Sequence, residues 1–132
     1  MSFVLDASVT ASWMLPDEPN VVAERVLDLL ATRRAFVPAI WWYEVRNLLV
    51  MSERRQRLNA YSSDRILADI ASYPITIDQE ADEAEILHIA RMNMLTFYDA
   101  AYVEIAVRRQ LPLATLDRAM AAAAASHGVP GM

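Results

Sequence analysis

Two acidic side chains of this 132-residue chain follow short apolar segments that suit buried strands. Asp6 ends the stretch FVLD, and Asp117 ends the stretch LATLD. In an open α/β sheet, ligands bind beyond the carboxyl ends of the strands, so both carboxylates are expected at a binding edge. A carboxylate in that place can cap the next helix, pair with a cation of the chain, or bind a metal ion.

Two further acids fall on the apolar faces of expected helices. Successive residues of a helix lie about 100° apart around its axis, which lets the faces be worked out. Glu44 then falls at the centre of the apolar stripe in IWWYEVRNLLVM. Asp99 shares its side of YDAAYVEIAVRR with apolar residues, whereas Glu104 and Arg108 form a polar strip near the opposite side. Both Glu44 and Asp99 are therefore predicted to point inward.

Burying ionised carboxylates costs free energy unless a cation compensates their charge. Four such residues favour one shared explanation, a cluster that binds a hard divalent cation such as Mg²⁺ or Mn²⁺. Repulsion within the cluster would raise the apparent pKa values of its members, and a bound cation would reverse that shift. A water molecule held by such an ion can attack a phosphodiester. The pattern thus predicts a metal-dependent hydrolytic site built from Asp6, Glu44, Asp99 and Asp117.

The composition narrows the chemistry further. All 12 basic residues are arginines, and without lysine the usual forms of P-loop nucleotide binding, Schiff-base catalysis and aspartyl-phosphate chemistry are excluded. The net charge of −5 argues weakly against a nucleic-acid partner, unless bound metal neutralises several acids. The absence of cysteine excludes disulfides and thiolate metal sites and suits a reducing cytoplasm. The longest apolar runs are too short to span a membrane.

Short strands alternate with longer helices along the chain, without repeats or linkers. We expect a turn at 16–19, strands at 2–5, 35–37, 74–77 and 113–115, and helices at 8–14, 21–32 after the cap Asn20, 39–57, 59–71, 79–94, 98–110 and 117–126. Asp78 is expected to be the plain N-cap of the fifth helix. This alternation predicts an α/β fold in one domain, residues 1–132, with a mainly parallel sheet and helices on both faces.

The motifs, in this order, resemble those of PIN-domain nucleases, and most closely those of the compact bacterial VapC-type toxins. The resemblance rests on DAS after the first strand, the inward acid Glu44, TFYDAAY at 96–102 and TLD at 115–117, and it spans nearly the whole chain. It implies a three-layer α/β/α sandwich with a small, mainly parallel sheet of four or five strands. It also implies a Mg²⁺- or Mn²⁺-dependent endoribonuclease that hydrolyses structured RNA, often tRNA.

The resemblance also assigns roles to single residues. The family's metal-binding and catalytic acids match, in chain order, Asp6, Glu44, Asp99 and Asp117. Ser8 and Thr115 match the hydroxyls that support the site, and Asn47, one turn after Glu44, is a further supporting candidate. As partners, the family implies a second copy in a homodimer and a VapB-type antitoxin whose tail covers the acidic pocket. The expected location is the cytoplasm.

Several alternatives stay open at this level. Asp6 and Asp117 can each be a simple helix cap. The enzyme can act on another nucleic acid, such as single-stranded DNA, and the domain can be a non-catalytic binding partner in a complex. Arg54, Arg55 and Arg57 suit an RNA backbone and a solvated helix end equally well. The last residues, SHGVPGM, leave little room for a fifth strand.

Overall fold

The computed structural model describes residues 1–15 and 19–132, so most of the turn expected at 16–19 lies outside the described residues. Along the chain, its elements are β1 (Phe3–Leu5), α1 (Ala7–Met14), α2 (Val21–Leu29), β2 (Ala35–Val37), α3 (Ala39–Arg54), α4 (Ala60–Ala71), β3 (Ile75–Ile77), α5 (Glu83–Asn93), α6 (Phe97–Arg109), β4 (Leu113–Ala114) and α7 (Arg118–Ser126). Each expected strand and helix is present, with ends that mostly differ by a few residues.

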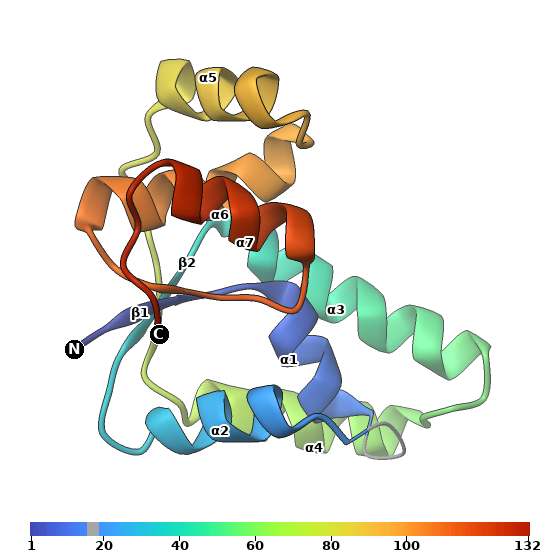
Figure 1. The fold of residues 1–132 in the computed structure, drawn as a ribbon. Coiled ribbons are helices and arrows are strands. Elements are labelled where there is room, and N and C mark those ends of the chain that lie inside the picture. The colour runs from blue at the N-terminus through green and yellow to red at the C-terminus, as the bar shows by residue number, and fades with distance from the viewer. Residues whose placement is uncertain (16–18) are drawn as a thin grey trace.

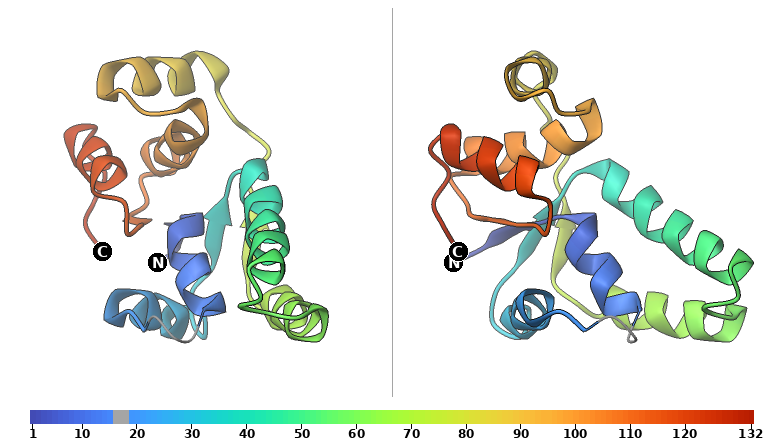
Figure 2. Two further views of the ribbon diagram at one scale, coloured as in Figure 1. Left: turned by 90° about the vertical axis from the view of Figure 1, so that its right-hand side faces the viewer. Right: turned by 45° about the vertical axis from the view of Figure 1, so that its right-hand side comes forward.

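The strands form one parallel sheet in the order β3-β2-β1-β4. The helices α5, α6 and α7 lie on one side of the sheet and α1 to α4 on the other (Figure 1, Figure 2). The three-layer α/β prediction is confirmed, with a sheet of four strands. Within the described part of the chain no fifth strand follows β4, and Val129 lies in the closing loop. No described helix combines the length and apolarity that crossing a membrane requires.

β1 is the most enclosed element of the sheet, and each of its three residues is at most 1% exposed. The main core packs β1 against residues of α1 to α4 on one side and of α6 on the other. A second cluster joins α5, α6 and α7, with Ile89 and Val103 completely buried. Because β1 is enclosed from both faces, the backbone that leads into Asp6 is held firmly.

α6 is buried on nearly every side, and its polar strip of Glu104 and Arg108 also packs against the rest of the protein. Glu104 is only 1% exposed. The Nε of Arg108 donates to Oε2 of Glu104 at 2.6 Å, and the backbone N–H of Asp82 donates to its Oε1 at 3.2 Å. The side of α6 opposite Asp99 therefore packs against the segment between β3 and α5 through a buried ion pair.

The prediction that Asp78 is a plain N-cap is wrong. α5 begins only at Glu83, and Asp82 caps it by accepting a hydrogen bond from the N–H of Glu85. In the sequence, an aspartate that caps the next helix cannot be told from one that forms ion pairs with arginines of a helix further along the chain. Only the tertiary packing decides between these two structures.

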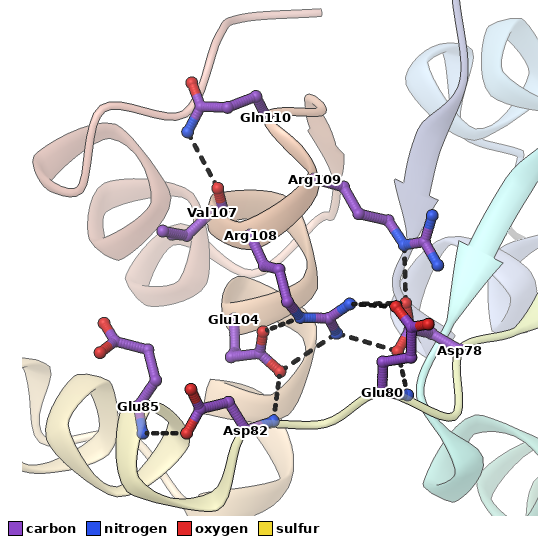
Figure 3. Close-up of polar contacts among 9 residues, drawn as sticks. All are labelled: Asp78, Glu80, Asp82, Glu85, Glu104, Val107, Arg108, Arg109 and Gln110. Carbon is purple, nitrogen blue, oxygen red and sulfur yellow. Dashed lines mark hydrogen bonds and ion pairs between the residues drawn. The ribbon is translucent and has the colours of Figure 1, made fainter.

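Asp78 instead fastens the end of β3 to the C-terminal end of α6. Its side chain is fully buried and accepts hydrogen bonds from Arg108 at 2.8 Å and from Arg109 at 2.6 Å (Figure 3). The guanidinium of Arg109 also lies 4.1 Å from the centre of the Phe36 ring in β2. Two strands and one helix thus meet at a compensated cluster of charges.

These ion pairs predict how stability depends on pH. Burial alone would raise the pKa of Asp78, but the hydrogen bonds from Arg108 and Arg109 outweigh it and lower the pKa from 3.8 to about 2. A lowered pKa stabilises the fold above the pKa of the unfolded state, and this stabilisation is lost as pH falls towards about 2. Asp78→Asn should therefore lower the free energy of unfolding at pH 7 by about 2 kcal/mol.

Urea unfolding of both proteins between pH 2 and 7 measures this effect. The difference between the wild type and Asp78→Asn should shrink as pH falls below about 4. Asp69→Asn removes an exposed carboxylate of α4 and should change stability by less than about 0.5 kcal/mol. Equal losses in the two variants would contradict the role of the ion pairs.

Candidate active site

Asp6 lies between β1 and α1, at the carboxyl edge of the sheet, and is 4% exposed. Its Oδ2 accepts hydrogen bonds from Ser8 Oγ at 2.6 Å and from Thr115 Oγ1 at 2.8 Å. Its side chain makes no capping hydrogen bond to α1, so the simple capping explanation of Asp6 is wrong. Two hydroxyl donors on one oxygen fix the orientation of this carboxylate.

The same two hydroxyls connect the start of α1 to the loop after β4. The N–H of Leu116 donates to Ser8 Oγ at 3.0 Å, and the N–H of Asp117 donates to Thr115 Oγ1 at 3.0 Å. Each hydroxyl therefore accepts from the backbone of this loop while it donates to Asp6. The loop that carries Asp117 is held beside Asp6 by these bonds. A functional role for the two hydroxyls stays a prediction.

Glu44 lies on α3 and is half-buried, with its Oε1 accepting a hydrogen bond from the Tyr102 hydroxyl at 2.7 Å. The buried residues of α3 are Trp41, Val45 and Leu49. Glu44 was expected at the centre of the buried face of α3, but it lies at the border of that face. The centre was misplaced because α3 carries apolar residues on nearly every side, including exposed ones.

Asp99 and Asp117 lie at the N-terminal ends of two helices. Thr96 caps α6 by accepting a hydrogen bond from the N–H of Asp99 at 3.1 Å, and the Asp99 side chain is half-buried in the first turn. Asp117 is exposed and caps α7, because its Oδ1 accepts from the N–H of Met120 at 3.0 Å. The capping alternative is correct for Asp117, but capping occupies only one of its two oxygens.

Glu44 and Asp99 lie close enough to other carboxylates of the set for those charges to affect their pKa values. Burial raises the pKa of Glu44; a hydrogen bond from Tyr102 opposes the rise, and the charges of Asp6 and Asp99 add to it. Burial also raises the pKa of Asp99, and the charges of Asp6 and Asp117 increase that rise. In the described chain none of the four forms an ion pair with an arginine or a histidine. No arginine or histidine side chain of the described residues therefore offsets the repulsion that acts on Glu44 and Asp99.

This set of donors suits a hard divalent cation, because it consists of carboxylate oxygens supported by hydroxyls, without sulfur or imidazole. As placed, however, no three acidic or histidine side chains of the described residues form a ready metal-binding group. Metal binding by Asp6, Glu44, Asp99 and Asp117 therefore stays a prediction.

Asn47 and Tyr102 differ in how well the sequence indicated them. Asn47 is exposed and makes no hydrogen bond to the four acids within the described residues, so its supporting role also stays a prediction. Tyr102 was expected only as part of the apolar side of α6, yet it is completely buried with its hydroxyl on Glu44. The available signal was its position three residues after Asp99, since a buried tyrosine hydroxyl usually finds a hydrogen-bond partner.

Comparisons with known proteins identify the family and the fold of this chain. The PIN domain family matches residues 3–126. Ribonuclease VapC3 from Pyrobaculum aerophilum is 31% identical over 125 residues, which cover 92% of this chain and 93% of the relative. The crystal structure of PAE2754 from Pyrobaculum aerophilum superposes with a TM-score of 0.74 at 23% identity, covering 93% of this chain and 84% of the other. At that identity, the structural match supports the fold alone.

Two substitutions separate the opposing effects on Glu44. Tyr102→Phe removes a hydrogen bond that favours the charged form, so the pKa of Glu44 should rise further. Asp99→Asn removes a neighbouring negative charge, so the pKa of Glu44 should fall. Carbon-13 NMR titration of the Glu44 carboxyl in metal-free buffer measures both shifts, with Glu83→Gln on α5 as a control that should leave this pKa unchanged. Shifts of the same sign in the two variants would show that the described contacts do not set this pKa.

Proposed function

Because this chain belongs to the PIN-domain family, as a VapC-type ribonuclease, we propose that it is a metal-dependent endoribonuclease toxin. Its substrate would be tRNA or another structured RNA, and its inhibitor a cognate VapB-type antitoxin. The observation that carries the proposal is the set of four carboxylates from separate elements, in which burial and neighbouring acids raise the pKa of Glu44 and of Asp99 and no arginine of the described residues forms an ion pair with any of the four. Such a set is costly to fold and useful only if a cation joins it.

Asp6, Glu44, Asp99 and Asp117 are the residues that would hold Mg²⁺ or Mn²⁺. When bound, such an ion supplies Lewis-acid stabilisation of the phosphate and a more acidic water molecule. The chain's own contribution is to orient the ligands. Asp6 is fixed by the hydroxyls of Ser8 and Thr115, and Glu44 is held by the hydroxyl of Tyr102. One of the carboxylates can accept the proton of the attacking water.

The helices that follow the strands favour an anionic substrate at the same edge. α1 begins directly after Asp6, and α7 begins directly after Asp117. α3 begins at Ala39, two residues after the end of β2. Their N-terminal ends carry partial positive charge, which attracts phosphate groups and moderates the repulsion among the carboxylates. An antitoxin that covers this edge would block access of RNA. The homodimer and the cytoplasmic location are proposed from the family resemblance.

Cleavage of a labelled RNA panel that includes tRNA tests the proposal. We expect cleavage with Mg²⁺ or Mn²⁺ and none with EDTA. Asp99→Asn should reduce the rate by about 100-fold or more, because the variant lacks one charged ligand. Asp69→Asn, the exposed control on α4, should cleave like the wild type. Metal-independent cleavage, or full activity of Asp99→Asn, would refute the proposal, and cleavage of single-stranded DNA alone would replace RNA as the substrate.

Thermal unfolding gives a second test that does not depend on finding the substrate. Burial, and then repulsion from Asp6 and Asp117, raise the pKa of Asp99, so its charged form destabilises the fold at neutral pH and metal-free Asp99→Asn should melt a few °C above the wild type. Mn²⁺ binds only the folded state and should raise the Tm of the wild type. It should raise the Tm of Asp99→Asn much less. An equal rise in both proteins would place the ion elsewhere.

A further inference from the structure

The outer edge of β4 carries backbone groups that no strand pairs with in the described chain. β4 pairs with β1 alone. On that inner side, the N–H of Asp6 donates to the C=O of Ala114 at 3.0 Å. Because the backbone groups of a strand alternate in direction, the N–H and C=O groups of Leu113 and Thr115 point away from β1. They form an open edge to which another strand can be added.

A groove of about 380 Å³ lies along this open edge, with α2 as its other wall. Its lining residues are Val22, Arg25, Val26, Leu29, Arg33, Leu113, Ala114, Thr115 and Met132. The residues from α2 recur at helical spacing, so that one face of the helix lines the groove. The acids of α2, Glu24 and Asp28, lie about 100° or more from the centre of that face. The groove is therefore apolar with arginines as its charged groups.

The two arginines of the groove are available for a ligand. Arg25 and Arg33 are exposed and form no ion pair with another described residue. An open strand edge binds an extended peptide through backbone hydrogen bonds, while pockets beside it receive alternate side chains. Arginine forms its strongest contacts with carboxylates and phosphates. The unpaired backbone groups of β4, the apolar lining of the groove and the charges of Arg25 and Arg33 together fit an extended peptide in which apolar and acidic residues alternate.

We propose that this groove between α2 and β4 is a docking site for an extended acidic segment of a partner protein, which adds a strand to the open edge of β4. Self-association through this edge is disfavoured, because pairing two copies about a twofold axis would bring like-charged sets of Arg25 and Arg33 together. RNA fits less well, because the floor is apolar and the strand offers alternating N–H and C=O groups.

Thr115 links this docking site to the carboxylates. Thr115 lines the groove, and its Oγ1 donates to Asp6 and accepts from the N–H of Asp117. A strand added beside Thr115 would therefore restrain the loop that carries Asp117. The effect on RNA cleavage rests on the proposed function, but docking itself does not depend on it.

A fluorescein-labelled octapeptide of alternating valine and glutamate, mixed with the intact chain, tests the docking. Binding is read by fluorescence anisotropy and by amide hydrogen exchange, in which Leu113 and Thr115 should gain protection. Combining Arg25→Glu with Arg33→Glu should weaken binding by about tenfold. Arg91→Glu, the same charge change at an exposed position of α5, should alter the affinity by less than about twofold.

A peptide that is N-methylated at alternate residues gives the decisive control. It keeps the side chains but loses the N–H groups that pair with the edge, so it should not bind. Equal binding of the methylated peptide, or no protection at Leu113 and Thr115, would overturn the proposal. So would an RNA oligonucleotide that protects these amides when the peptide does not bind. Cleavage assays without peptide report on the proposed function separately.

Discussion

The main constraint on this fold is the negative charge that four carboxylates place at one edge of the sheet without an ion pair to a described arginine or histidine. Burial and neighbouring carboxylates both disfavour the charged forms of Glu44 and Asp99, and neither acid forms an ion pair with a cation of the described residues. A fold can keep such a cluster only if other terms stabilise it. Here the fully enclosed β1, the hydroxyls on Asp6 and the positive ends of several helices do so. Stability and function therefore make opposite demands on the same side chains.

The two ends of α6 show that this lack of compensation is specific to the site. At the C-terminal end, Arg108 and Arg109 neutralise the buried carboxylate of Asp78, and its pKa is lowered. At the N-terminal end, burial and the charges of Asp6 and Asp117 raise the pKa of Asp99, and no described arginine forms an ion pair with it. The chain has 12 arginines, so it does not lack cations in general. The position of the arginines along α6 therefore separates the compensated cluster around Asp78 from the uncompensated acids near Asp99.

The sequence was informative wherever local pattern decides the structure. Strand and helix alternation predicted the layers, and an acid directly after a buried strand predicted the place of Asp6. It was less informative where distant partners decide. Nothing local distinguishes Asp78, which receives arginines from α6, from Asp117, which does cap its helix. The face of α3 was misjudged because apolar residues surround it, and the contact of Tyr102 with Glu44 joins residues 58 positions apart.

The pairing of β1 with β4 determines how late in folding the contacts around Asp6 can form. The hydroxyls of Ser8 and Thr115, which both donate to Asp6, are 107 positions apart. During synthesis β1 emerges early and can pair with β2, but its other neighbour, the edge strand β4, emerges only about a hundred residues later. Contacts so distant along the chain form late in folding. A chain that stops before Thr115 therefore lacks one of the two donors to Asp6 and the loop that carries Asp117.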